Sequence, residues 1–262
     1  MSMKKGVLAK WGCIPAVVIL SAFLAVVSCS TATVKEYKVR VVGEFPHDSL
    51  SYTQGLFFQD GRFYESTGQW GESTFREVEL ETGKSLSCKN FGKEYFVEGS
   101  VMLGGVLYIL TWTSHVLFKY DAATLEYIGA ANYPRQGWWL TTDGKSLIAS
   151  DGSSNLYFLN PETLATERKV KVRMNDRPLN YLNELEWIDG KIWANVYMTD
   201  YIVVINPKNG RVERRIDCKG LLPVNLREPR TDVLNGIAFH DGHIYLTGKY
   251  WRRLYEVELE KK

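Results

Sequence analysis

Polar and charged residues recur at matching places in five segments of this sequence. Each segment has a tight turn that contains glycine, and the residue seven positions before that glycine (eight in the third segment) is an amide or a carboxylate. These residues are Gln54, Glu98, Gln136, Asn183 and Asn235. Seven positions after the same glycines stand Gly68, Trp112, Asp151, Tyr197 and Lys249. A few polar groups among aromatic side chains are typical of a binding pocket.

The turns predict that both sets of residues meet at one end of the fold. Asp-Gly and Gly-Gly between apolar stretches are hairpin signals, since such turns need positive φ. The turns are Asp60-Gly61, Gly104-Gly105, Asp143-Gly144, Asp189-Gly190 and Asp241-Gly242. A hairpin returns the end of its second strand to the level of the start of its first.

A structural interpretation competes with the pocket for some of these residues. Amides at strand starts satisfy free backbone groups, which would suffice for Asn235, Gln136 and Asp151. It explains Glu98 poorly, because an isolated carboxylate near a channel is costly. It also says nothing about Lys249 or about the tryptophans at 112, 138 and 251.

The repeat predicts an all-β fold. The turn glycines recur at intervals of 44, 39, 46 and 52 residues, and each unit has room for about four strands. This period is typical of propeller blades, so we expect a five-bladed β-propeller rather than a sandwich. The fifth unit, Asn235 to Leu259, is short, and the alternating segment Glu36 to Phe45 is expected to close the last blade as an N-terminal strand. We expect very little helix.

The first 28 residues are typical of a targeting segment. Three lysines precede an apolar run from Cys13 to Val27 that is too short for a confident membrane span. The run ends at Val26-Val27-Ser28-Cys29, which matches a bacterial lipoprotein signal; an ordinary signal peptide with a chance cysteine is the alternative. We therefore predict a signal peptide at 1–28, lipidation of Cys29, a short linker at 29–35 and the propeller at 36–262. Ser30, rather than Asp, follows Cys29, and by resemblance to enterobacterial lipoproteins this favours an exported protein held at the outer membrane, facing the periplasm or the surface.

Net charge and cysteine content limit the classes of partner that the sequence favours. Three of the 32 basic residues and none of the 30 acidic residues lie in 1–28, so the remaining chain is nearly neutral, which argues against nucleic acid. Cys88 and Cys218 occupy equivalent places in different units, and we expect two free thiols. A monomer that meets the membrane through its lipid anchor alone is expected.

Short strings in all five units resemble one family. They are YTQGL (52–56), YESTG (64–68), FVEGS (96–100), LTW (110–112), QGWWL (136–140), SDGS (150–153), LNELEW (182–187), WANVY (193–197), VLNGIA (233–238) and TGKYW (247–251). Together they resemble the plant and bacterial glutaminyl-peptide cyclotransferases of the papaya-latex type, over nearly the whole chain after the targeting segment. That family is a five-bladed propeller.

The resemblance implies an acyltransferase that converts N-terminal glutamine of peptides and proteins to pyroglutamate and releases ammonia. Glu98 matches the catalytic carboxylate, and Asn183 and Lys249 match the residues that hold the reacting amide oxygen. The expected substrate-binding residues are Tyr52, Gln54, Phe96, Trp112, Gln136, Trp138, Tyr197 and Trp251. Gln136, Trp139 and Tyr197 depart from the usual Glu, Gly and Trp, which bears on substrate preference more than on activity.

The implied reaction is general acid/base catalysis without a cofactor or metal. The pair His240 and His243 lies on a hairpin turn with no third zinc ligand in evident range, and no Gly-x-Ser-x-Gly elbow supports nucleophilic hydrolysis. The main alternative is a non-catalytic surface lipoprotein propeller that binds peptide or glycan ends. Loss of the carboxylate, the amide or the lysine would favour it, and all three are present.

Overall fold

The computed structural model describes residues 33–262, which belong to one compact unit. This unit contains several hydrophobic clusters of its own, and we expect it to fold without the residues before it. The predicted signal peptide and Cys29 lie outside the described residues. Within 33–262, no helix has the length and apolar character needed to cross a membrane.

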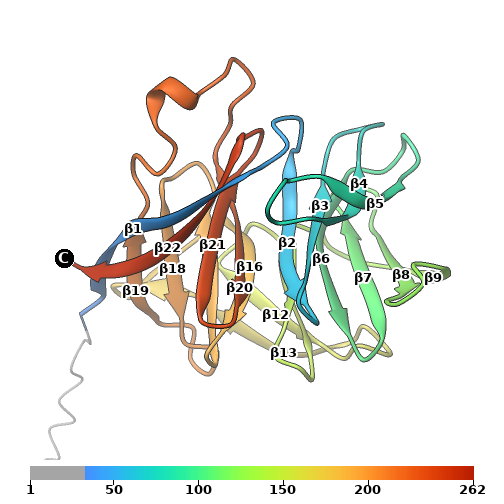
Figure 1. Ribbon diagram of the computed structural model, residues 1–262. Helices are drawn as coiled ribbons and strands as arrows, with labels where there is room; N and C mark the ends of the chain where they lie inside the picture. The colour runs from blue at the N-terminus through green and yellow to red at the C-terminus, as the bar shows by residue number, and fades with distance from the viewer. Residues whose placement is uncertain (1–32) are drawn as a thin grey trace, which may run out of the picture. The chain divides into compact units, whose positions relative to one another are not determined.

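The described chain is built from β-strands, as predicted (Figure 1). One four-stranded sheet has the order β2 (Thr53–Gln59), β3 (Arg62–Thr67), β4 (Thr74–Val78), β5 (Ser85–Asn90). A second has β6 (Val97–Leu103), β7 (Val106–Thr111), β8 (Val116–Asp121), β9 (Tyr127–Asn132). A third has β10 (Trp139–Thr142), β11 (Leu147–Ser150), β12 (Asn155–Leu159), β13 (Thr166–Lys171). In each sheet the strands follow chain order.

The remaining strands form an eight-stranded sheet and a two-stranded one. The large sheet has the order β16 (Leu182–Ile188), β17 (Lys191–Val196), β18 (Tyr201–Ile205), β19 (Val212–Asp217), β1 (Lys35–Pro46), β22 (Arg253–Lys261), β21 (His243–Gly248), β20 (Leu234–His240). The small sheet pairs β14 (Arg173–Met174) with β15 (Arg177–Pro178). The one helical element among residues 33–262 is a 3₁₀ turn, η1 (Val224–Leu226).

The N-terminal strand joins the two ends of the chain. β1 pairs antiparallel with β22 over almost its whole length, so it occupies the outer position expected for Glu36 to Phe45. Its first residues also pair in parallel with β19. Both edges of β1 are thereby occupied at its start, which removes an open edge that could pair with another chain.

The first strands of the five units lie next to one another in a ring. β2 contacts β6 and β20, and β10 contacts β6 and β16, which in turn contacts β20. The hairpin turns between first and second strands have the predicted positive φ, as at Asp189 (49°) and Gly190 (73°). Apolar side chains pack between neighbouring sheets: Ile148 and Leu156 of one sheet share a buried cluster with Ile192 of the next.

Cys88 and Cys218 are both free thiols, as predicted. Cys88 is exposed on β5, whereas Cys218 is buried directly after β19.

Candidate active site

Backbone irregularities place the polar residues that open the first strands. Four of these strands lose regular register at that residue: Thr53/Gly55, Val97/Ser100, Leu182/Leu185 and Leu234/Ile237. A β-bulge redirects the side chains at its position. The residues inside the four irregularities include Gln54, Glu98, Asn183 and Asn235.

Second strands return to the same end of the fold, as the hairpins predicted. Just beyond four of the five second strands, a backbone N–H donates to a carbonyl just before the paired first strand. These bonds are Gly68 to Tyr52 (2.9 Å), Trp112 to Phe96 (2.9 Å), Tyr197 to Tyr181 (2.8 Å) and Lys249 to Val233 (2.9 Å). The two sets of residues therefore meet at one end of the sheets.

A cavity of about 180 Å³ opens at this end. It is smaller than the roughly 300–1,000 Å³ of sites for drug-sized ligands, so it suits a single residue of a substrate. Its lining residues are Tyr52, Gln54, Phe96, Glu98, Trp112, Trp138, Asn183, Tyr197 and Lys249. The structure thus brings together the three predicted catalytic residues and all the predicted binding residues except Gln136 and Trp251.

Gln136 is exposed beside the cavity rather than in its lining. Its Oε1 accepts hydrogen bonds from the indole N–H of Trp112 (3.2 Å) and of Trp138 (3.3 Å). It therefore holds two walls in place, and a carboxylate at this position would accept the same bonds.

Trp251, which the sequence predicts to bind substrate, does not line the cavity. Its side chain is buried in a hydrophobic cluster against Tyr255, and its indole N–H donates to the carbonyl of Asp232 at 2.9 Å. The reason is local, because β21 ends at Gly248 and the chain turns there, with Trp251 N–H donating to the Gly248 carbonyl. Strand alternation does not continue to Trp251.

Aromatic rings form the walls of the cavity. Phe96 meets the rings of Tyr52 (6.0 Å between centroids) and Trp112 (5.6 Å) edge to face, and Trp138 meets Tyr197 in the same way (5.9 Å). Trp138 also packs so closely on Gly152 that a Cβ there would lie 2.5 Å from the indole. These contacts fix the rings and limit the water in the cavity.

Two further aromatic residues support this wall and were missed in the sequence. Trp70 meets Phe96 edge to face at 5.7 Å, and Tyr250 packs on Tyr52 at 5.2 Å. Trp70 lies two residues after the aligned Gly68, and Tyr250 lies inside the string TGKYW; proximity in sequence to aligned positions was the available signal.

Glu98 and Lys249 are buried charges whose pKa values move towards neutrality. Burial raises the pKa of Glu98 well above 4.5, against the opposing effect of Lys249. Burial likewise lowers the pKa of Lys249 to about 8, although Glu98 and Asp232 favour its charged form. The Lys249 Nζ lies 4.3 Å from the ring centroid of Tyr52 and 5.3 Å from that of Tyr197, where a cation is attracted to the ring face. Asp232 was not among the predicted residues.

A chain of amides fixes the third polar group. Asn183 Nδ2 donates to Asn235 Oδ1 at 2.8 Å. Asn235 Nδ2 donates in turn to the Thr53 carbonyl (2.8 Å) and to Gln54 Oε1 (3.3 Å). An amide nitrogen carries two hydrogens, so Asn183 keeps one N–H for another acceptor. The structural interpretation is correct for Asn235, which satisfies a backbone carbonyl and also orients Asn183.

Comparison with known proteins identifies the family. A family model described as glutamine cyclotransferase matches residues 15–259. The chain belongs to this family. A glutaminyl-peptide cyclotransferase of Arabidopsis thaliana is 40% identical over 232 residues, which cover 86% of this chain and 72% of that protein. The crystal structure of Myxococcus xanthus glutaminyl cyclase superposes with a TM-score of 0.82 at 33% identity, over 87% of this chain and 99% of that one.

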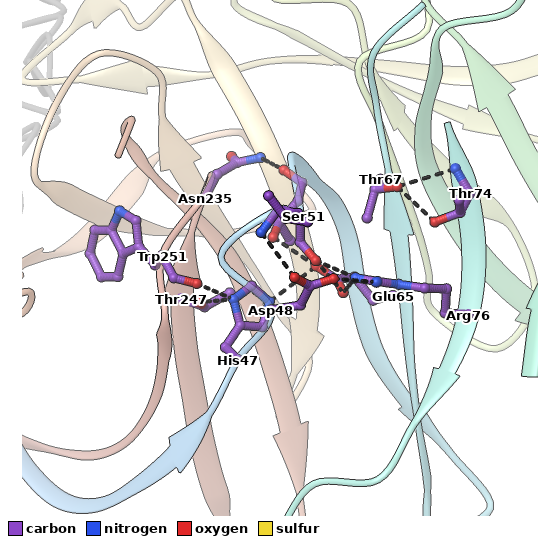
Figure 2. A network of polar contacts seen from close by, with 12 residues as sticks. His47, Asp48, Ser51, Glu65, Thr67, Thr74, Arg76, Asn235, Thr247 and Trp251 are labelled. Carbon is purple, nitrogen blue, oxygen red and sulfur yellow. Dashed lines mark hydrogen bonds and ion pairs between the residues drawn. The ribbon is translucent and has the colours of Figure 1, made fainter. Parts of the chain in front are cut away.

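This member of the glutamine cyclotransferase family has a second buried charged cluster, the ion network (His47, Asp48, Ser51, Thr53, Glu65, Arg76). Figure 2 labels its members His47, Asp48, Ser51, Glu65 and Arg76. The Glu65 carboxylate accepts from Arg76 (2.5 Å), Thr53 (2.8 Å) and His47 (3.1 Å). Arg76 also pairs with Asp48 at 2.8 Å.

The ion network connects parts of the chain that carry the site. His47 Nδ1 donates to the carbonyl of Trp251 at 2.6 Å, in the segment directly after Lys249. Burial disfavours the charged form of Glu65, but the positive charges of Arg76 and His47 nevertheless lower the pKa of Glu65 to about 2. The network therefore holds the loop before β2 against β3, β4 and the Lys249 segment.

Three other residues singled out in the sequence of this glutamine cyclotransferase family member, Trp139, Asp151 and His243, make contacts outside the cavity. Trp139 is buried in the core rather than in the cavity, so its departure from the family pattern does not touch the lining. Asp151 accepts from the hydroxyls of Ser153 (2.5 Å) and Tyr157 (2.9 Å). His243 bonds to Glu256 at 2.6 Å on the fifth hairpin.

Proposed function

We propose that this protein is a glutaminyl-peptide cyclotransferase that converts N-terminal glutamine of peptides and proteins to pyroglutamate and releases ammonia. One observation carries the proposal: a buried carboxylate, Glu98, lies in a small aromatic cavity with Lys249 and Asn183. The names of the Arabidopsis and Myxococcus relatives agree with it.

The proposed reaction is an intramolecular attack. The α-amine of the terminal glutamine attacks its own side-chain amide carbon; a C–N bond forms to close the five-membered ring, and the C–N bond to ammonia breaks. Because both groups belong to one residue, the enzyme mainly has to select the bent conformer. A small cavity walled by Trp112 and Trp138 suits that selection.

Glu98 is the proposed general acid and base. Its carboxylate takes a proton from the attacking amine and gives it to the leaving nitrogen. One group performs both transfers best when its pKa lies near the working pH, and burial moves the pKa of Glu98 in that direction.

Lys249 and Asn183 are the proposed donors to the carbonyl oxygen, which gains negative charge during the attack. With its pKa at about 8, Lys249 is still mostly protonated at neutral pH. Asn183 has one N–H left after its bond to Asn235. Donors held in place before reaction are effective because they need no reorganisation. The scheme uses no metal or cofactor.

We also infer a five-bladed β-propeller. Support comes from three four-stranded sheets and an eight-stranded sheet that divides into two four-stranded halves where β19 meets β1. The ring of contacts among β2, β6, β10, β16 and β20 gives the same count. In this description β1 is the outer strand of the last blade.

Export, lipidation at Cys29 and a place at the outer membrane, with a monomeric propeller, remain part of the proposal on sequence grounds. Incorporation of a labelled fatty acid into the protein expressed in a bacterium, and its loss in Cys29→Ser, tests the anchor.

Ammonia release from a Gln-initiated dipeptide by purified residues 30–262, with a chelator present, tests the activity. Glu98→Gln is expected to lower the rate of release about 10³-fold. Glu186→Gln is the control, because Glu186 is a partly buried carboxyl whose pKa is raised by burial to about 8, yet it does not line the cavity. Release that survives in the control but not in Glu98→Gln supports the proposal. A folded protein that binds the dipeptide without release would support the non-catalytic binding propeller instead.

A further inference from the structure

A strongly basic face lies at the end of the described chain where β1 begins. Two hollows share Asn209 and Arg211, one of about 460 Å³ and one of about 330 Å³. The basic side chains that line them, here named the basic face, are Lys35, Lys169, Lys171, Arg173, Lys208, Arg211 and Arg214. Only two acidic residues, Asp176 and Glu213, line the same hollows.

Nearby acidic residues neutralise little of this positive charge. Glu213 is occupied by Lys191 at 2.8 Å and Asn206 at 2.7 Å, and Asp176 lies 3.8 Å from Arg211. The other members of the basic face make no ion pair with an acidic residue of 33–262. By contrast, surface residues close by in the same large sheet are paired, such as Lys38 with Glu260 (3.1 Å) and Lys262 with Asp217 (2.6 Å).

The basic face is held together by backbone contacts, so it does not depend on flexible loops alone. The Arg173 N–H donates to the Gly210 carbonyl at 2.8 Å, and Arg173 forms a parallel bridge with Arg211. These bonds fix the end of β13 and the start of β14 against the β18–β19 turn, which carries Lys208.

The basic face also lies close in sequence to the predicted lipid anchor at Cys29. Thr33 and Lys35 line one of its hollows. Thr33 lies four positions after Cys29, and an extended chain of that length spans at most about 14 Å. A lipidated Cys29 would therefore hold the basic face close to the membrane surface.

The cavity lies at the other end of β1. That strand runs from Lys35, beside Arg214, to Pro46, beside Arg253 in the segment after Lys249 (Figure 1). Twelve residues of strand extend over about 35 Å. A molecule that rests on the part of the basic face at the start of β1, with Lys35 and Arg214, would thus keep the far end of that strand and the cavity entrance there away from the membrane.

We propose that the basic face binds the anionic headgroups of membrane phospholipids and orients the enzyme with its cavity directed towards the solvent. This contact comes in addition to the lipid anchor, and it does not depend on the proposed catalytic activity. Clustered Lys and Arg residues bind anionic lipid surfaces additively, and salt weakens the attraction.

Co-sedimentation of residues 30–262 with vesicles tests the proposal without the lipid anchor. Vesicles of phosphatidylglycerol and phosphatidylcholine in equal parts are compared with vesicles of phosphatidylcholine alone, at low and at physiological salt. We expect binding to the anionic vesicles only. The triple variant Lys169→Gln, Lys171→Gln, Arg173→Gln is expected to lower the partition coefficient on the order of 100-fold.

A second triple variant, Lys84→Gln, Lys145→Gln, Lys219→Gln, is the matched control, because it removes the same charge from exposed lysines outside the basic face. It is expected to bind nearly as well as the parent. Equal losses in both variants, or no binding of the parent to the anionic vesicles, would overturn the proposal. Unchanged thermal unfolding and ammonia release in both variants show that folding and catalysis are intact.

Fluorophores at two positions test the orientation. In a Cys88→Ser background, Asn209→Cys places a label on the basic face, and Val224→Cys places one in η1, just before the strand that begins at the cavity end. A quencher carried by the lipid should quench the first label and spare the second. Equal quenching of both would overturn the proposed orientation.

Discussion

Two buried charged clusters among residues 33–262 show opposite responses to burial. Glu98 and Glu65 are both almost completely excluded from solvent. The pKa of Glu98 is raised well above 4.5, whereas that of Glu65 is lowered to about 2. Their partners make the difference: Glu65 accepts direct hydrogen bonds from Arg76 and His47, but Lys249 acts on Glu98 only through its charge.

This contrast separates a structural role from a chemical one. A carboxylate that is fully hydrogen-bonded and ion-paired stays ionised and is a poor proton acceptor at neutral pH. A buried carboxyl without such bonds can exchange a proton near neutral pH. The ion network therefore holds the loops in place, and the cavity residues remain available for catalysis.

Replacement of Glu98 should have the largest effect on activity. Glu98→Gln keeps the shape but cannot carry a proton, and kcat should fall about 10³-fold, within the usual range for loss of a general acid/base. Steady-state ammonia release measures it. The free energy of unfolding should change less than in Glu65→Gln, since Glu98 makes no direct ion pair among residues 33–262. A variant that keeps more than a tenth of the parental kcat would exclude Glu98 as the proton carrier.

Replacement of Glu65 should have the opposite result: a large loss of stability and a small loss of kcat. Glu65→Gln leaves Arg76 and His47 without their shared carboxylate, and breaking such a buried pair costs about 3–5 kcal/mol of unfolding free energy. Below its unfolding temperature the variant should keep kcat within a few-fold. Urea unfolding at pH 7 gives the loss, and Glu77→Gln on β4 is the control, with an expected loss below about 1 kcal/mol because its pairing with Arg62 is at the surface.

The pH dependence of that loss provides a second check. The pKa of Glu65 is lower in the folded protein than its ordinary 4.5, so its stabilisation is complete above pH 4.5 and disappears as the pH falls towards 2. The difference between parent and variant should therefore shrink between pH 7 and pH 3. A constant difference would mean that the carboxylate charge is not what stabilises the loops.

The cavity could be predicted from the sequence because its polar residues lie at equivalent positions of the repeat units. Glu98, Asn183 and Lys249 occupy aligned places around the turn glycines, and hairpin geometry is enough to bring aligned places to one end. The expectation for Trp251 has the same origin, but it extends the spacing past the end of β21, where the chain turns and Trp251 does not reach the cavity lining.

The ion network could not be predicted in this way. Its members come from non-equivalent places: His47 and Asp48 precede β2, Glu65 lies on β3 and Arg76 on β4. Glu65 and Arg76 are cross-strand partners on β3 and β4. The contacts of His47 with Glu65 and with the Trp251 carbonyl depend instead on how β1 and β22 close the sheets, and no spacing in the sequence encodes that closure. Asp232 was missed for a similar reason, because it belongs to the irregular segment before β20.

Replacement of Lys249 tests whether the buried cation of the cavity contributes to activity. Lys249→Met should lower kcat/KM about 100-fold through loss of a donor to the developing oxyanion. In the parent, the lysine loses its proton as the pH rises through about 8, so the activity that depends on its charge should decline above that pH. Lys249→Arg stays charged there. Its pH profile should extend to higher pH even if the rate is lower, and an identical alkaline decline in both proteins would assign that decline to another group.

Asn235 tests whether hydrogen bonds inside the cavity wall matter as much as those of the ion network. Asn235→Ala removes the acceptor that orients Asn183, and we expect kcat to fall roughly 10-fold, the scale of one hydrogen bond, with KM little changed. If Asn235 acts through Asn183, the same substitution should have almost no further effect on kcat in an Asn183→Ala background, because coupled residues are not additive. Additive losses would instead mean that Asn235 supports the cavity through its bond to the Thr53 carbonyl, and Asn183 would then be oriented without it.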